Sequence, residues 1–309
     1  MVNPTAFLLR RFGRLLLTVF IVSTVVFFIV RVIPGDPAEV IAGIEASPED
    51  IAAVRARLGS DRPMLNQYAG WLFAVLRLDL GLSYSSGQPV TALILERFPL
   101  TLSLALLGMA IGLLLAIPLG VLSAVHRGSL WDISGLLLSQ IGMAIPSFWL
   151  GILLLLLFSV KLRIFPLFGS GGFRHLVLPA LSLGLARAAV LLRLSRSAMI
   201  EELGKEYLVA ARAKGLRDFS VRYKHALRNA LIPVITVAGI QLGYMLGGAI
   251  IIEQVFSLPG MGKLILTAIY QRDFPLIQGG VVFVALVFSL INFLVDILYS
   301  FINPRIRIQ

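Results

Sequence analysis

Residues 100–125 read Leu-Thr-Leu-Ser-Leu-Ala-Leu-Leu-Gly-Met-Ala-Ile-Gly-Leu-Leu-Leu-Ala-Ile-Pro-Leu-Gly-Val-Leu-Ser-Ala-Val, without one charged side chain. A helix of about 20 apolar residues is long enough to cross the hydrocarbon core of a bilayer, and this run is longer. Backbone polar groups in lipid must be satisfied within their own segment, so the run is expected to be an α-helix. The stretch therefore predicts an all-α membrane protein.

Five further apolar runs extend this prediction over the whole chain of 309 residues. Only 14% of the residues are charged, whereas soluble proteins average about 25%. The mean hydropathy is +0.92. The five runs are Leu15–Ile33, Ile133–Val160, Leu176–Leu192, Ala230–Ile252 and Gly279–Phe301. Together with 100–125 they predict six transmembrane helices.

The first run could be mistaken for a signal peptide, because Arg10, Arg11 and Arg14 precede it. It is longer than a usual signal-peptide core, however, and no small-residue cleavage site precedes Arg31. We therefore expect an uncleaved first span.

The distribution of basic residues predicts the orientation, because Lys and Arg accumulate on the cytoplasmic side. The outer loop 31–98 holds 6 basic and 8 acidic residues, and the loop 161–175 dissents with three basic residues. Four segments hold 15 basic against 5 acidic residues and are predicted to be cytoplasmic: 1–14, 126–132, 193–229 and 302–309. Both termini are thus expected in the cytoplasm. The net charge of +11 follows membrane sidedness, so no nucleic-acid partner is expected.

The outer loop carries helix signals of its own. Ser47 is a suitable N-cap, Pro48 suits the first helical position, and Gly59 stands where such a helix would end. The amphipathic stretch Gln67–Leu78 follows. We expect a small periplasmic helical subdomain over 34–98, although an interfacial loop without a specific partner is the alternative.

The chain has no cysteine, which excludes disulfides, Cys-ligated zinc and thiol catalysis. Its three histidines, His126, His175 and His225, show no ligand spacing, so neither a metal site nor a cofactor is expected. No nucleophile–base pair is visible in the spans, so the sequence gives no support for an intramembrane enzyme.

The cytoplasmic loop 193–229 is the most informative segment for function. Glu201–Lys214 suits a short helix that Gly215 closes with a left-handed turn, and a second short basic helix leads back to the membrane. Small side chains at Ala210, Ala211 and Ala213 would let the helix lie close in a groove of a soluble partner. The alternative is a solvated basic loop held by anionic lipid.

The loop contains Ala210-Ala211-x3-Gly215, followed by His225-x-Leu227-Arg228-Asn229-Ala-x-Ile-Pro233. With these two strings it resembles the coupling loop of binding-protein-dependent ABC importer permeases, in the variant of the dipeptide/oligopeptide/nickel family. The general motif begins Glu-Ala-Ala, whereas Val209 stands first here, and Arg228 replaces a usual proline. Further matching strings run along the chain: Pro34-Gly35-Asp36-Pro37, Asp79-Leu80-Gly81-Leu82-Ser83, Ile145-Pro146-Ser147-Phe148, Glu253-x2-Phe256-x2-Pro259-Gly260-x-Gly262, Arg272-Asp273-x-Pro275-x2-Gln278, and Val295-Asp296 with Asn303-Pro304-Arg305.

The resemblance implies a type I importer permease of a bacterial inner membrane. Its expected partners are a homologous second permease, two ATPase subunits and a periplasmic solute-binding protein. It implies import of di- or oligopeptides, with nickel and glutathione as alternatives in the same class. It divides the chain into a first span (1–33), a periplasmic subdomain (34–98), a permease core (99–303) and a tail (304–309). The residues expected to contact the ATPase are Glu206, Tyr207, Ala210, Ala211, Ala213, Gly215, His225, Leu227, Arg228 and Asn229.

No phosphate-binding G-x4-G-K-[S/T] motif occurs in the sequence. Gly260-Met-Gly262-Lys263 is the nearest string, and it lacks the spacing and the hydroxyl residue. ATP hydrolysis is therefore expected in a separate subunit, so that the chain itself is a transporter subunit and no enzyme. An ion-coupled secondary transporter is the alternative of another class, but it would need several carboxylates at span centres.

Polar and small residues within the spans have their own interpretations. Gly239, Gly243 and Gly247 share one face of the fifth span, which indicates close helix packing and leaves a role in the pathway open. Asp296 is expected to form an interhelical hydrogen bond or ion pair rather than a proton relay. Arg187 is expected to extend toward the cytoplasmic surface.

Overall fold

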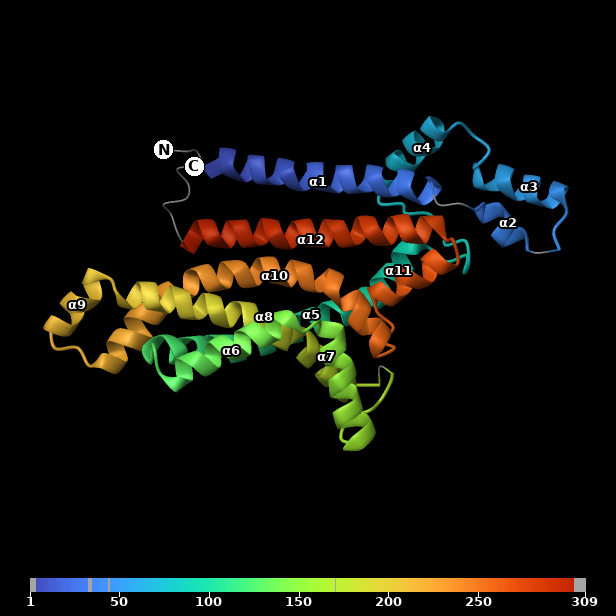
Figure 1. The fold of residues 1–309 in the computed structure, drawn as a ribbon. Coiled ribbons are helices and arrows are strands. Elements are labelled where there is room, and N and C mark those ends of the chain that lie inside the picture. Colours follow the sequence, from blue (N-terminus) through green and yellow to red (C-terminus); the bar gives the residue numbers. More distant parts are fainter. Residues whose placement is uncertain (1–3, 33–34, 44, 170, 303–309) are drawn as a thin grey trace. The chain divides into compact units, whose positions relative to one another are not determined.

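The computed structural model describes residues 4–32, 35–43, 45–169 and 171–302 (Figure 1). These ranges contain no strand, and an antiparallel bridge joins Leu82 to Pro89. The predicted tail 304–309 lies outside the described residues. The helices are α1 (Pro4–Val32), α2 (Pro37–Ala42), α3 (Pro48–Leu58), α4 (Met64–Leu76), α5 (Val90–Val125), α6 (Leu130–Ala144), α7 (Ser147–Leu154), the π-helical η1 (Leu155–Lys161), α8 (Phe173–Leu203), α9 (Glu206–Ala213), the π-helical η2 (Ser220–Ala226), α10 (Leu227–Val255), α11 (Met261–Tyr270) and α12 (Phe274–Ile302).

The prediction of an all-α membrane protein is confirmed. Within the described residues, five helices are long and apolar enough to cross a membrane, and a bent pair makes a sixth if it counts as one span. That pair is α6 with the α7–η1 helix, which meet at 99°. The bend arises because Pro146 has no N–H to donate and forces Ile145 into an extended conformation. The expected continuous span Ile133–Val160 is therefore divided.

The first compact unit, here the core unit, comprises residues 1–12, 102–258 and 290–309. In it α8 packs alongside α6, α7 and α10 (Figure 1). The backbones of α5 and α8 approach closely, since a Cβ added to Gly184 would lie 2.6 Å from the carbonyl oxygen of Gly108. Small residues allow such contact where lipid supplies no hydrophobic drive between helices.

The second unit, here the loop unit, comprises residues 13–101 and 259–289. Its apolar core includes Val30, Ile94 and Met261, with Trp71 of α4 packed against it. The ring centroids of Phe27 and Trp71 lie 5.3 Å apart. These contacts fix α4 on the C-terminal part of α1.

The helix signals of the loop between the first two spans are confirmed. Ser47 Oγ accepts from the Asp50 N–H at 3.2 Å, Asp50 closes the reciprocal capping box, and Pro48 opens α3. Gly59 ends the helix at φ 67°. The second predicted stretch, Gln67–Leu78, corresponds to α4.

Candidate functional site

The loop 204–226 forms two short helices between α8 and α10, but the first begins later than the sequence suggests. The expected helix Glu201–Lys214 is wrong in its first part, because α8 continues through Leu203 and α9 begins at Glu206. Gly204, a poor helix former, ends α8, and Lys205 adopts an extended N-cap conformation at ψ 141°. The break turns α9 away from the axis of α8 (Figure 1).

Gly215 closes α9 with a left-handed turn, as expected, at φ 82°. Its N–H donates to the Arg212 carbonyl at 2.9 Å, and the Leu216 N–H donates to the Ala211 carbonyl at 3.3 Å. This pair of bonds is the Schellman arrangement, which satisfies carbonyl groups that the helix end leaves without partners. The chain thereby reverses direction and enters η2.

A cluster around Glu202 joins α8, α9 and α10. The Glu202 side chain is almost fully buried. Tyr207 Oη donates to Glu202 Oε1 at 2.6 Å, and Lys205 Nζ lies 2.5 Å from Oε2. Asn229 Nδ2, near the start of α10, donates to Tyr207 Oη at 2.9 Å. One phenol thus connects the ends of two long helices through α9; we call these four residues the Glu202 cluster.

The protonation state of Tyr207 suits this role. Burial and then the hydrogen bond to Glu202 raise the pKa of the Tyr207 phenol above its usual value. Because the neutral form is favoured, the proton that Tyr207 donates to Glu202 stays in place at pH 7.

Leu208 anchors α9 to the membrane helices. Its side chain is fully buried among Val121 and Met199, together with Val221 of η2. Burying a leucine stabilises a structure by roughly 1.5–3 kcal/mol relative to leaving it exposed. This contact holds the inner face of α9, and Ala211 and Leu227 pack against the same group.

The opposite face of the loop presents apolar side chains to its surroundings. Phe219 is 73% exposed, and its ring lies 4.7 Å from that of Tyr223. Val209 and Leu216 are also exposed. Apolar side chains gathered at a helical turn are typical of a protein-binding surface.

The other predicted residues of the loop fall into two sets. Glu206, Ala210, Ala213 and Arg228 are exposed, whereas His225 is half-buried. The structure therefore unites Tyr207 with Asn229 and places Ala211 and Leu227 inward. Tyr207, Gly215 and Asn229 are exposed too, so seven of the ten predicted residues are accessible. Glu202 was missed, although its i,i+3 spacing to Lys205 at the end of an apolar run could have indicated an ion pair.

A second missed feature is a buried ion pair on the neighbouring helices. Asp132 of α6 is 3% exposed. Arg196 of α8 contacts both its carboxylate oxygens, at 2.5 and 2.8 Å. The Gly128 N–H and the Ser123 hydroxyl each donate to the same carboxylate at 2.9 Å. The pair locks the α5–α6 turn to α8.

The charged residues predicted within the spans have defined partners. Asp296 Oδ2 lies 2.6 Å from Arg11 Nη1. Arg187 Nη1 donates to Gln241 Oε1 on α10 at 3.0 Å, so the neighbouring helix supplies a partner for its guanidinium. Among the described residues, no group of three or more metal-ligating side chains is placed to hold an ion.

The three glycines of the fifth span have different surroundings. A Cβ on Gly239 would lie 2.2 Å from Val295 Cγ2 of α12, whereas a Cβ on Gly247 would meet nothing within 4 Å. Gly243 is buried. The stripe therefore combines an internal packing contact with an open position.

This difference predicts the result of a matched pair of substitutions. Gly239→Leu is expected to destabilise the chain by about 1–3 kcal/mol, because Val295 and α12 must move. Gly247→Leu in the same helix is expected to leave stability unchanged. Thermal unfolding in detergent measures both, and equal effects would contradict the assigned contact.

Two family models match the sequence. Residues 116–308 match "Binding-protein-dependent transport system inner membrane component", and residues 5–105 match the N-terminal model of the same membrane component. The chain is 42% identical over 311 residues to a Brucella abortus protein named for a peptide transport system permease, covering 98% of this chain and 99% of the relative. It is also 42% identical over 301 residues to the glutathione transport system permease protein GsiC of Salmonella choleraesuis, covering 97% and 98%.

Solved structures share the fold at lower sequence identity. The MetNI methionine ABC transporter in an inward-facing conformation matches with a TM-score of 0.56 at 20% identity, over 68% of this chain and 96% of that one. An amino acid ABC transporter matches with a TM-score of 0.52 at 15% identity, over 70% and 94%. The fold is therefore that of a type I importer permease.

Proposed function

Because this chain belongs to the family of binding-protein-dependent transport system inner membrane components, the permeases of ABC importers, we propose that it imports di- or oligopeptides as half of a translocation pathway. The relatives named for peptide and glutathione transport support this substrate class. Glutathione is itself a tripeptide, so both names describe solutes with an amide backbone and free carboxylates. Glutathione is the second candidate, supported by the GsiC relative.

The loop from 201 to 229 is proposed as the surface that receives an ATPase. The exposed side chains of Val209, Ala210 and Phe219 would enter a groove of that subunit. A movement of α9 would then be transmitted to the transmembrane helices through the buried Leu208. The Glu202 cluster is the observation that best supports this role, because it ties the same helix to both α8 and α10. In this scheme both termini are cytoplasmic, and residues 34–98 face the periplasmic binding protein.

The assembly proposed is this chain with a homologous second permease, two ATPase subunits and a solute-binding protein. ATP-driven closure of the ATPases would push α9 and reopen the spans toward the outside. The spans would then accept solute from the binding protein. An ion-coupled secondary transporter would need no such partners.

We predict that uptake of a labelled dipeptide into proteoliposomes requires ATP, the ATPase subunits and the binding protein together. Omitting any one is expected to reduce uptake to the level of empty vesicles. Glutathione is tested beside the dipeptide to separate the two candidate solutes. Uptake driven by an ion gradient through this chain alone would refute the proposal.

A further inference from the structure

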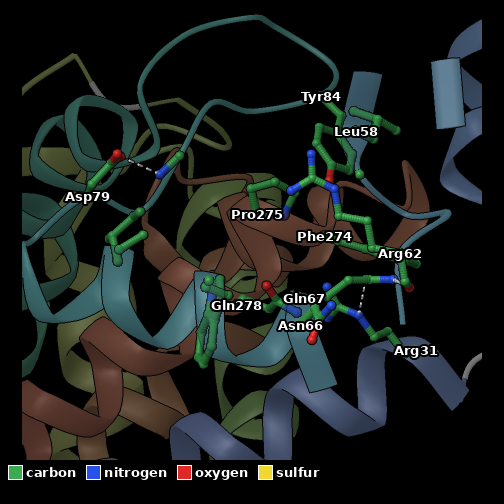
Figure 2. A pocket seen from close by; sticks show the side chains of 16 residues that line it. Arg31, Leu58, Arg62, Asn66, Gln67, Asp79, Tyr84, Phe274, Pro275 and Gln278 are labelled. Carbon is green, nitrogen blue, oxygen red and sulfur yellow. Dashed lines mark hydrogen bonds between the residues drawn. The ribbon is translucent and has the colours of Figure 1, made fainter. Parts of the chain in front are cut away.

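The loop unit contains a cavity of about 290 Å³. The proposed coupling mechanism gives no role to the polar side chains that line it. It lies between α4, the end of α1, the 79–84 turn and the first turn of α12 (Figure 2). Two strings noted in the sequence meet here, since Asp79 and Gly81 line the cavity together with Pro275 and Gln278. The cavity is close to the lower size of common small-molecule sites.

Two arginines give this cavity a positive end. Arg31 Nε donates to Gln67 Oε1 at 3.1 Å, and its Nη1 donates to the Phe27 carbonyl at 3.1 Å. Both acceptors are neutral. Within the ranges that the structure describes, neither Arg31 nor Arg62 forms an ion pair. No carboxylate oxygen of the described residues therefore lies within ion-pair distance of either guanidinium.

The lining holds one carboxylate, and it lies away from the arginines. Asp79 Oδ1 accepts from the Gly81 N–H at 2.9 Å. Figure 2 shows Asp79 at the opposite end of the view from Arg31 and Arg62. The site thus has room for an anion at one end only.

A buried amide completes the polar set. Gln278 is 2% exposed, and its Nε2 has no hydrogen-bond partner among the described residues. A buried donor without a hydrogen-bond partner is destabilising. A ligand with an oxygen acceptor in the cavity would remove that cost.

The other residues that line the cavity are suited to an amphipathic ligand rather than to a simple inorganic ion. Trp71, Phe274, Pro275 and Leu80 form apolar walls next to the polar end. Guanidinium groups bind carboxylates through paired charge-assisted hydrogen bonds, and apolar walls suit a small side chain. The chemistry therefore matches a carboxylate attached to a short apolar stem.

We propose that this cavity binds the C-terminal carboxylate of a small peptide, with Arg31, Arg62 and Gln278 as its ligands. The inference rests on the proposed peptide import, and it assigns the loop unit a direct contact with solute. Arg62, which is exposed, would close on the ligand, whereas Arg31 is already positioned by Gln67.

The test measures binding of L-alanyl-L-alanine to the intact importer complex in nanodiscs, without the binding protein, by saturation-transfer NMR. Its C-terminal amide serves as the uncharged comparison. Arg62→Gln is expected to weaken dipeptide binding by about tenfold or more, the loss typical of one hydrogen bond to a charged group. Gln278→Glu would place a carboxylate in the site and is expected to abolish binding.

Arg57→Gln is the matched control, because Arg57 is an exposed arginine of α3 outside the cavity. It is expected to bind the dipeptide like the unmodified complex. Equal binding of the amide, unchanged binding in Arg62→Gln, or no binding at millimolar dipeptide would overturn the inference. Native mass spectrometry adds a further arm: an anionic lipid retained by the unmodified complex and lost in Arg62→Gln would identify a lipid site and also overturn it.

The same complexes are then assayed for ATP-driven uptake with the binding protein restored. Uptake without peptide binding at this cavity would leave the proposed function intact and refute the inference. Peptide binding without ATP-driven uptake would refute the proposed function and leave the cavity assignment standing.

Discussion

Replacing Gly215 with valine is expected to reduce solute uptake per ATP hydrolysed by about tenfold while the protein still inserts and assembles. Gly215 sits at φ 82°, where an ordinary residue costs about 1–2 kcal/mol and a β-branched residue more. Because a Cβ there would meet nothing within 4 Å, the penalty comes from the backbone and not from a clash. The turn is expected to open, which frees the C-terminal end of α9.

Gly13→Val in α1 is the control for this prediction. A Cβ at Gly13 would likewise meet nothing within 4 Å, but Gly13 does not have a positive φ. Uptake and ATP hydrolysis are measured in parallel in proteoliposomes. If Gly215→Val kept the normal ratio of uptake to hydrolysis, the closed turn would have no part in coupling.

Replacing Asp132 with asparagine is expected to destabilise the core unit by roughly 1–4 kcal/mol, between the values for exposed and fully buried pairs, because it leaves the half-buried Arg196 without its counter-charge. Thermal unfolding in detergent measures the loss. Asp218→Asn is the control, since Asp218 is exposed and lies 3.5 Å from its basic partners Arg212 and Arg222. Exposed pairs of this kind contribute about 0–1 kcal/mol.

A double variant checks the cause of that loss. Asp132→Leu with Arg196→Met removes both charges, and buried ion pairs replaced by apolar residues often retain stability. The double variant is therefore expected to be more stable than Asp132→Asn. If the double variant were less stable than Asp132→Asn, the ion pair would contribute more to stability than the neutralisation of two charges.

The membrane class and the caps of α3 could be predicted from the sequence because they depend on local composition. Apolar run length identifies a span, and Ser47 with Pro48 and Gly59 identifies a helix by short-range hydrogen bonding. The bend at Pro146 was less accessible, because proline within a span can either kink a helix or break it. The geometry depends on which neighbours accommodate it.

The residues of the candidate site that belong to a recognisable sequence motif could be predicted. Those that depend on contacts between residues far apart in the sequence could not. Gly215 and Tyr207 lie in the loop motif itself. Glu202 and Asp132 were missed because their burial follows from tertiary packing, and a carboxylate near a loop is by default read as solvated. Arg187 illustrates the same limit, since its partner Gln241 is on another helix.

The Glu202 cluster also determines how a movement of α9 would be transmitted to the neighbouring helices. If α9 were joined to them through one flexible side chain, it could shift without moving them. Here Tyr207 connects to both flanking segments, and Leu208 beside it is embedded in their packing. Two separate contacts therefore join α9 to its neighbours, so a partner that displaced α9 would displace α8 and α10 with it.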